Sequence, residues 1–304
     1  MSVKISEKHL LTLADKKIFE QYLQLKSHEL STYSFANIYI WKSLFEIFWY
    51  LIDDSLCLFF NNQGGCFMYL SPLSAVIKPE IIKQCFEIMD GLNINPMLSR
   101  IENVEAGELK DYQNMEFIQK EKLGDYLYSR ASLAGLKGNE YKSKRSDYNK
   151  FIKNLKFKYR DYSEFDKNEC LVLLENWINT RKNNNEDQLY QYMLDDIYPV
   201  QQSAIKNYSK LNLIGRVVEV DGAIQAYTFG YEINLSTFCV MFEVINNKYK
   251  GIAQFIFREL SKEMSFYSYI NCMDDSGLEN LVKVKSSYRP CRIVKNSIII
   301  RNKF

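Results

Sequence analysis

The sequence has very few histidines and no closely paired cysteines. Its 304 residues include only His9 and His28, both in the first tenth of the chain. A multi-histidine metal site is therefore impossible, and neither a Ser-His-Asp nor a Cys-His catalytic apparatus is expected. The seven cysteines are an odd number without a C-x-x-C motif, which indicates buried, reduced thiols rather than a disulfide framework or a zinc site. We expect no bound metal.

A long hydrophobic run is also missing. The most apolar stretch, residues 44–60, is interrupted by Glu46, Asp53 and Asp54. It is shorter than the about 20 apolar residues that a transmembrane helix needs. The amino-terminal residues contain no apolar segment typical of a signal peptide. We therefore expect no transmembrane segment and a cytoplasmic location.

Neither sign of charge dominates the chain. The 39 Lys and Arg residues against 37 Asp and Glu residues give a net charge of +2, which argues against a DNA-coating protein. The chain contains no Walker A, G-x-G-x-x-G, H-E-x-x-H or G-x-S-x-G motif, so nothing favours a P-loop, dinucleotide, zincin or nucleophile-elbow enzyme. With 47% apolar and 25% charged residues, the composition is that of a globular protein.

What the sequence does contain is a repeated order of helices and strands. The hydrophobic spacing and turn residues of the first half predict a helix at 12–28, strands at 45–52, 55–60 and 66–70, a helix at 79–91 and a strand near 97–101. The second half predicts helices at 163–180 and 188–208, strands at 213–220, 223–231 and 237–245, a helix at 253–264, a strand at 267–272, a helix at 276–287 and a final strand at 293–300. We expect an α+β protein of two similar domains, 1–130 and 131–304.

The loop after the third predicted strand of the second half is the first candidate site. It contains Lys248, Lys250, Gly251, Ile252 and Ala253. A glycine-containing turn at the start of a helix presents free backbone N–H groups and the positive end of the helix dipole to an anion. Gly251 permits a close approach of the backbone, and the lysines add charge. The alternative is an ordinary strand-to-helix turn with solvated lysines.

Glu243 is the second candidate, because it lies on the same apolar strand between Phe242 and Val244. Burial would raise the pKa of its carboxyl toward the range of a general base. An edge-facing or salt-bridged glutamate is the alternative of about equal weight.

Two further groups of polar residues are candidates. Asn271, Asp274 and Asp275 lie between a predicted strand and a predicted helix, where they could hold a substrate amine or cap the helix; capping is favoured. The run 137–160 has an excess of positive charge and contains a candidate phosphate or RNA patch. That patch consists of Lys142, Lys144 and Arg145. A solvated helix face explains the run at least as well.

Four blocks of the chain, in order, resemble one bacterial family. The blocks are 33–41 (YSFANIYIW), 136–145 (LKGNEYKSKR) with 149–151, the pair 242–243 with 249–251, and 271–290. The chain is similar to the uncharacterised group related to the C-terminal catalytic domain of phosphatidylglycerol lysyltransferases. Three positions depart from that family's pattern: Lys142 replaces His, Met273 replaces Glu and Val282 replaces Arg.

The resemblance implies two tandem GNAT-like domains, each with a mixed, mainly antiparallel sheet flanked by helices. It implies an acyl- or aminoacyltransferase that uses an acyl-CoA or an aminoacyl-tRNA as donor. The acceptor would be an amine or hydroxyl of a small molecule, a lipid head group or a peptide. No covalently bound cofactor is expected.

The resemblance also implies roles for individual residues. The loop 248–253 would hold the donor phosphates, and backbone N–H groups of the strand 242–244 would polarise the carbonyl. Glu243 would be the base and Tyr288 the acid for the leaving group. The departures at Met273 and Val282 favour instead a non-catalytic GNAT-fold protein that binds a ligand or partner. A third possibility is RNA binding through the basic run.

Overall fold

The computed structural model describes residues 3–113 and 115–302. It divides the chain into two compact units: unit 1 extends to residue 125 and includes the chain from 294 onward, and unit 2 spans 126–293. The last strand of the chain therefore belongs to unit 1, whereas the sequence placed it in the second domain. The reason is its pairing: β12 (Arg292–Arg301) runs antiparallel to β5 (Arg100–Glu105).

The two units repeat one order of elements, as the sequence predicted. In each, a strand is followed by two helices, three antiparallel strands, a helix and a strand parallel to the last of the three. In unit 1 these are β1 (His9–Leu10), α1 (Lys16–Leu23), α2 (Phe35–Ile40), β2 (Glu46–Ile52), β3 (Ser55–Asn62), β4 (Gly65–Met68), α3 (Pro79–Leu92) and β5. In unit 2 they are β7 (Phe157–Asp161), α6 (Lys167–Asn183), α7 (Gln188–Lys206), β8 (Ile214–Val220), β9 (Ala223–Asn234), β10 (Thr237–Ile245), α8 (Ile252–Glu263) and β11 (Tyr269–Asn271).

The remaining elements lie around this repeat. They are β6 (Phe117–Ser129), α4 (Arg130–Gly135), α5 (Lys142–Asn154), α9 (Glu279–Ser286) and β12. Short 3₁₀ helices occur at Leu13–Asp15, Trp41–Ser43, Pro96–Leu98, Leu109–Tyr112 and Glu164–Asp166. Six elements were not predicted from the sequence as separate ones: β1, β6, β7, α2, α4 and α5.

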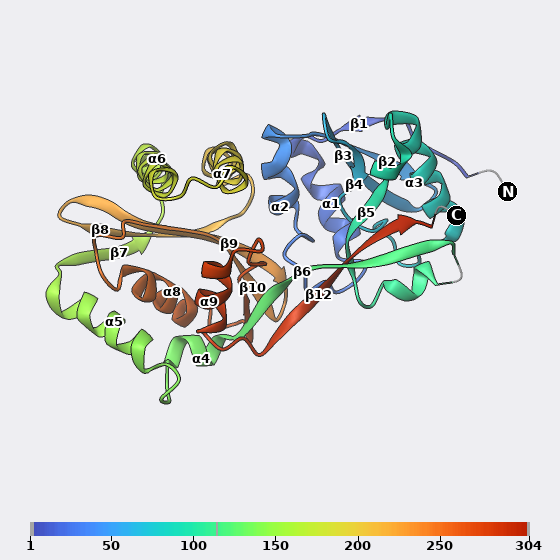
Figure 1. Ribbon diagram of the computed structural model, residues 1–304. Helices are drawn as coiled ribbons and strands as arrows, with labels where there is room; N and C mark the ends of the chain where they lie inside the picture. The colour runs from blue at the N-terminus through green and yellow to red at the C-terminus, as the bar shows by residue number, and fades with distance from the viewer. Residues whose placement is uncertain (1–2, 114, 303–304) are drawn as a thin grey trace. The chain divides into compact units, whose positions relative to one another are not determined.

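Each unit is built on a mixed, mainly antiparallel sheet. The strand order is β1-β2-β3-β4-β5-β12-β6 in unit 1 and β6-β11-β10-β9-β8-β7 in unit 2, where β6 crosses from one unit to the other. In unit 2, α6 and α7 cover one face of the sheet, and α8 lies with α4 and α5 on the other (Figure 1). The predicted fold class is confirmed.

Local sequence signals explain the elements that frame the site. The side chain of Asp166 accepts a hydrogen bond from the Ser163 backbone N–H at 2.7 Å, which forms the capping box before α6. Asp221 and Gly222 both have positive φ, 54° and 81°, and join β8 to β9 in a tight hairpin. These contacts fix β8, β9 and α6, the elements that surround β10.

Candidate functional site

The two parallel strands of unit 2 are paired only near their beginnings. Thr237, Phe238 and Cys239 of β10 lie opposite Tyr269, Ile270 and Asn271 of β11. β11 ends there, whereas β10 continues to Ile245. On this side, the second half of β10 has no strand partner among the described residues, so its backbone groups are open to a ligand.

A β-bulge in β10 decides which way Glu243 points. The register with β9 shifts between Val240 and Phe242. Before the shift, Phe238 and Val240 pack in a cluster with α8, and after it Ile245 packs against the neighbouring cluster on the same helix. The shift therefore places Glu243 on the α8 face, where strict alternation would have placed Phe242.

The backbone of Glu243 faces the open edge. Asn246 donates its N–H to the carbonyl of Gln225 in β9 at 2.8 Å. In an antiparallel pair, successive residues direct their backbone groups to opposite sides. The N–H groups of Glu243 and Ile245 therefore point away from β9, toward the open edge, and that of Val244 points toward β9. Of the predicted stretch 242–244, Glu243 is the residue whose N–H is available to a carbonyl.

The carboxyl group of Glu243 is poorly solvated. Burial among apolar neighbours raises its pKa from 4.5 to about 8. Tyr288 lies nearby, and its own pKa is raised by burial and then by the charge of Glu243. Its ring packs edge-on against Phe257 at 5.1 Å, and the ammonium group of Lys144 lies over it, 4.3 Å from its centre. Tyr288 thus lies close enough to the Glu243 carboxyl to be affected by its charge, and its ring contacts the ammonium group of Lys144.

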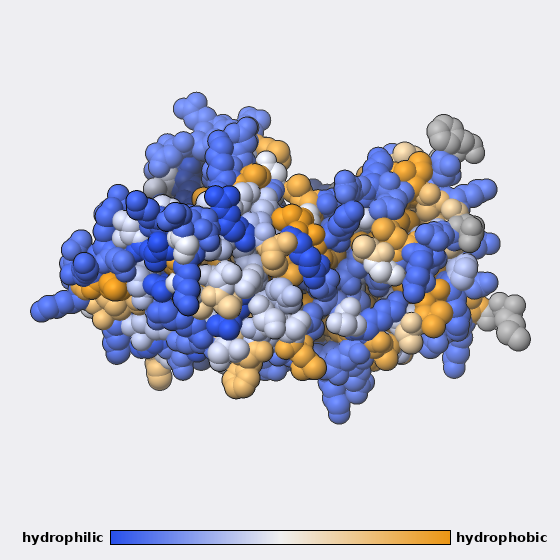
Figure 2. Space-filling view, turned by 90° about the horizontal axis from the view of Figure 1, so that it is seen from below, coloured by the Kyte–Doolittle hydropathy of each residue, from blue (hydrophilic) through white to orange (hydrophobic). Residues whose placement is uncertain are grey.

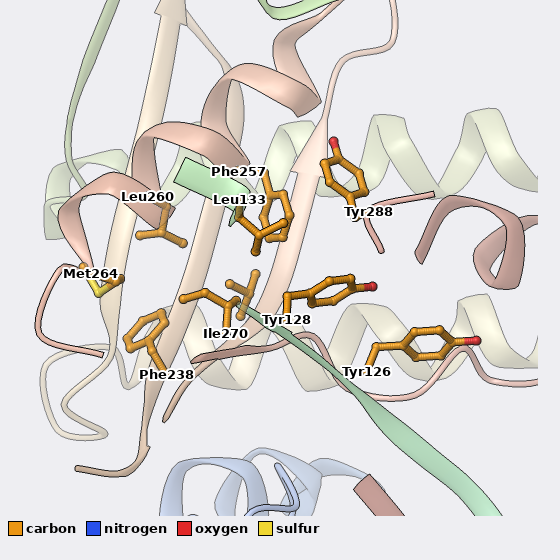
Figure 3. Close-up of a cluster of buried hydrophobic side chains, with 10 residues drawn as sticks. Tyr126, Tyr128, Leu133, Phe238, Phe257, Leu260, Met264, Ile270 and Tyr288 are labelled. Carbon is orange, nitrogen blue, oxygen red and sulfur yellow. The ribbon is translucent and has the colours of Figure 1, made fainter. Parts of the chain in front are cut away.

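Figure 3 shows how the apolar cluster behind these groups is arranged. Tyr288 lies beside Phe257, and the hydroxyls of Tyr126 and Tyr128 point away from Phe238. The cluster is therefore an apolar packing surface, and the hydroxyls of Tyr126 and Tyr128 lie at its edge.

The loop between β10 and α8 leaves several backbone donors free. Tyr249 and Ile252 donate their N–H groups to the carbonyls of Asn246 and Tyr249, at 3.1 and 3.2 Å. Four other donors have no acceptor among the described residues: the N–H groups of Lys250, Gly251, Ala253 and Gln254. Together with the exposed side chains of Lys248 and Lys250, they can hold an anion.

Gly251 is required by packing within unit 2. Its φ is +90°, and a Cβ atom there would lie 2.1 Å from the carbonyl oxygen of Asp147 in α5. From the sequence, the glycine was expected to let the loop backbone approach an anion; in the structure, the atom that excludes a side chain at this position belongs to the backbone of α5. The side chain of Ile252 is fully buried and belongs to the core beneath the loop.

The polar residues before α9 are engaged in the turn itself. Asn271 accepts a hydrogen bond from the Met273 N–H at 2.7 Å, and Asp274 accepts one from the Ser276 N–H at 2.7 Å. Asp275 is 7% exposed and accepts hydrogen bonds from the Gly277 N–H at 2.9 Å and the Tyr126 hydroxyl at 2.7 Å. These contacts order the loop that follows β11.

The three basic residues of the predicted patch do different things. Arg145 donates to the carbonyls of Leu136 and Gly138 at the end of α4. Lys144 is half-buried over the ring of Tyr288, and burial lowers its pKa. Lys142 is exposed. On the side of unit 2 where α5 lies, hydrophilic residues cover most of the surface (Figure 2).

Sequence reasoning missed two features of this site. The bulge in β10 has no sequence signature, and the position of Lys144 over Tyr288 depends on how α5 packs. Within the described part of the chain, no group of three or more His, Cys, Asp or Glu side chains could hold a metal ion. None of its helices is long and apolar enough to cross a membrane.

The comparison with protein families decides the relationship. Residues 24–299 match the family described as "Phosphatidylglycerol lysyltransferase, C-terminal". The chain belongs to this family. No curated protein matches the chain.

Solved structures share the architecture. A conserved protein of unknown function from Bacteroides thetaiotaomicron is 25% identical with a TM-score of 0.86, over 97% of this chain and 99% of that one. L-PGS from Bacillus licheniformis is 14% identical with a TM-score of 0.64, over 95% and 93%. A tandem GNAT protein from the clavulanic acid biosynthesis pathway is 8% identical with a TM-score of 0.52, over 97% of both chains. These likenesses show that the fold is that of tandem GNAT-like proteins.

Proposed function

We propose that unit 2 transfers an acyl or aminoacyl group from a phosphate-bearing donor to an amine or hydroxyl acceptor. The observation that carries this proposal is the open edge of β10. It presents the N–H and the carboxyl of Glu243 beside a helix start with free backbone donors. The donor is an acyl-CoA or an aminoacyl-tRNA.

The donor phosphates would bind at residues 248–253. Anions are stabilised at a helix N-terminus by unpaired N–H groups and by the helix dipole. Lys248 and Lys250 are exposed beside these groups and pair with no carboxylate among the residues that the structure describes, so their charges add to the attraction. The donor's ester or thioester carbonyl would then extend along the open edge of β10.

Glu243 supports the transfer step in two ways. Its N–H would stabilise the negative charge that develops on the carbonyl oxygen. With a pKa of about 8, its carboxylate is a stronger base than a solvated glutamate and can take the proton of the attacking amine or hydroxyl. The new bond forms to the carbonyl carbon as the bond to the thiol or tRNA oxygen breaks.

Tyr288 would return a proton to the leaving group. Its raised pKa keeps the phenol protonated at neutral pH. The ammonium group of Lys144 over the ring would stabilise the phenolate that remains. The proton taken up by Glu243 then leaves to solvent, and Tyr288 is reprotonated.

The family description suggests the first group and acceptor to test. It names a lysyl group and phosphatidylglycerol. A small-molecule amine and a peptide amine are the other acceptor classes.

Calorimetric titration of the full chain tests donor binding. We expect one site for coenzyme A and acetyl-CoA, or for charged tRNA. The double variant Lys248→Glu with Lys250→Glu should weaken donor binding at least about tenfold, because the two substitutions reverse two charges beside the phosphates. The matched control is Lys78→Glu, which changes the exposed lysine before α3 of unit 1.

Two results would contradict the proposal. If neither donor binds, or if the loop variant binds as tightly as the wild type, residues 248–253 do not hold the donor. If a donor binds at the loop but no group moves to any acceptor class, the protein is the non-catalytic binding module that the departures at Met273 and Val282 favour.

A further inference from the structure

A groove lies in unit 2 between α6, the start of β9 and the end of β10. Its volume is 720 Å³, and it is lined by one side of α6 over residues 168–183, by residues 223–225 and by residues 245–248. A second cavity of 270 Å³ shares Thr180, Arg181 and Asn247 with it. The space is large enough for a ligand with more than one chemical group.

A stacked pair of side chains forms one wall of the groove. The guanidinium of Arg181 lies over the indole of Trp177, 3.8 Å from its centre, and both side chains are half-buried. The two residues are one helical turn apart on α6, so the helix holds them in register. Guanidinium and indole planes are surfaces on which a flat ring stacks.

The charge of Arg181 is not balanced by the protein. Among the described residues, its guanidinium donates to no carbonyl and pairs with no carboxylate. Burial lowers its pKa, which shows that the cation is partly removed from water. By contrast, Arg160 of the same unit makes a double contact with Asp166. A half-buried cation without a partner is stabilised by an anionic ligand.

Side-chain amides also line the groove. Asn176, Asn179 and Asn183 line the groove from α6, and Asn247 lines it from the loop after β10. Amides offer a donor and an acceptor side by side, which matches the edge of a nucleobase. The carboxylate that lines the groove, Glu169, accepts a hydrogen bond from the Ile224 N–H at 3.0 Å.

The groove adjoins the loop to which the donor phosphates are assigned. Residues 246–248 line it, and the same loop ends at Gly251 before α8. Lys248 therefore borders both places. A phosphate held at the loop has a base-sized, amide-lined space next to it.

We propose that this groove binds the adenosine nucleotide end of the donor, with the base on the Trp177–Arg181 pair and a phosphate near Arg181 and Lys248. That the nucleotide is part of a donor rests on the proposed function, whereas the presence of a nucleotide site in the groove does not. Adenosine 3′,5′-bisphosphate represents the end of coenzyme A, and a short RNA ending in CCA represents the end of tRNA.

Calorimetric titration of the full chain with these two probes tests the site. Trp177→Ala should weaken the probe that binds by about tenfold or more, since stacking on an aromatic side chain contributes about 1–3 kcal/mol per base. Trp177→Phe, which keeps an aromatic surface, should stay within about threefold of the wild type. Arg181→Gln should also weaken binding by about tenfold, because it removes a charge-assisted contact.

Two variants outside the groove serve as matched controls. Tyr192→Ala removes an exposed aromatic side chain from α7, and Lys206→Gln removes an exposed positive charge from the end of the same helix. Both should bind the probe as the wild type does. Thermal unfolding of all variants checks that the fold is kept.

The outcomes separate this proposal from the proposed function. Binding of either probe that is lost in Trp177→Ala supports the site, and it still does so if the wild-type protein transfers no group. The proposal is overturned if neither probe binds, if Trp177→Ala and Arg181→Gln leave binding unchanged, or if pyrophosphate alone binds as tightly as the nucleotide. If Trp177→Ala keeps its transfer activity and its donor affinity is unchanged, the proposed transferase function is supported and the groove is not the nucleotide site.

Discussion

Each unit has an equivalent pair of parallel strands, β4 and β5 in unit 1 and β10 and β11 in unit 2. The connection that follows the first strand of the pair differs between the units. In unit 1, residues 69–78 lead from β4 to α3; in unit 2, residues 246–251 lead from β10 to α8. Residues 70–74 are buried, and Leu73 exchanges two backbone hydrogen bonds with Leu56, at 3.0 and 2.9 Å. In unit 2 the connection is shorter, and together with the first turn of α8 it keeps four backbone N–H groups without a described acceptor.

The difference extends to the helix starts and the strands. α3 begins with Pro79, which has no N–H to offer a ligand, whereas α8 begins after Gly251. β4 ends after four residues, whereas β10 runs for nine and carries Glu243 on its open half. If the loop of unit 2 holds the donor phosphates as proposed, a single connection decides which unit has the anion site. In unit 1 the equivalent space is taken up by buried residues and by the backbone pairing of Leu73 with Leu56.

The largest expected effect concerns Gly251. Gly251→Ala should lower the free energy of unfolding by about 3 kcal/mol or more, because a positive φ costs about 1–3 kcal/mol and overpacking costs about 1–3 kcal/mol. The added Cβ would meet the carbonyl of Asp147. Gly91→Ala, in α3 of unit 1, has open space around it and should stabilise the protein by about 0.5 kcal/mol. Denaturant unfolding measures the free energy of unfolding of both variants. If Gly251→Ala were as stable as the wild type, the loop would not pack on α5 as described.

Glu243→Gln should lower the turnover number about 100-fold with little change in donor affinity, because it removes the base and keeps the backbone N–H. In the wild type, the carboxyl must lose its proton to act. The rate should therefore rise with pH up to about 8 and then level off, and the variant should lack this inflection. Glu46→Gln, on the exposed start of β2, is the control. Unchanged turnover in Glu243→Gln would exclude this residue as the base.

The same residue predicts how stability depends on pH. A carboxyl whose pKa is higher in the folded than in the unfolded protein holds its proton longer when folded, so stability falls as pH rises from about 4.5 to about 8. Above pH 8 the deprotonated, poorly solvated carboxylate therefore lowers the free energy of unfolding of the wild type. Thermal unfolding at pH 5 and pH 9 should show Glu243→Gln gaining stability over the wild type only at the higher pH. If the two proteins differed in stability by the same amount at pH 5 and at pH 9, the carboxyl of Glu243 would not be desolvated.

The smallest effects concern single lysines. Lys248→Gln and Lys250→Gln should each weaken donor binding by about two- to fivefold, since one exposed charge contributes about 1 kcal/mol or less. Added salt should narrow the difference. Lys78→Gln, before α3, should have no effect. Titrations in low and high salt measure the donor affinity of the three variants. If all three have the same affinity, the lysines of the unit 2 loop contribute no more to donor binding than Lys78 of unit 1.

The sequence predicted the repeat and most of its elements because they depend on local periodicity and turns. The strand 237–245 and the hairpin at Asp221 and Gly222 are found where they were expected. The return of β12 to unit 1 could not be predicted, since strand pairing across the chain has no local signal.

The candidate site was predictable in its residue types and less so in its geometry. Glu243 stood out as a carboxylate on an apolar strand, but only the bulge after Val240 shows which face it joins. Helix capping was favoured over substrate binding for Asp274 and Asp275, but α9 begins after Leu278 without a side-chain cap. The two carboxylates instead accept hydrogen bonds from the N–H groups of Ser276 and Gly277, and Asp275 also accepts one from the Tyr126 hydroxyl. Such choices depend on tertiary packing and loop conformation.

Hydrogen–deuterium exchange of the full chain, with and without a saturating donor, tests the central difference between the units most directly. We predict that the donor slows exchange at residues 246–254, where N–H groups are free to bind phosphate, and leaves residues 69–78 unchanged. Slower exchange at 69–78, or no change at 246–254 under a donor that binds, would contradict the assignment of the donor site to unit 2.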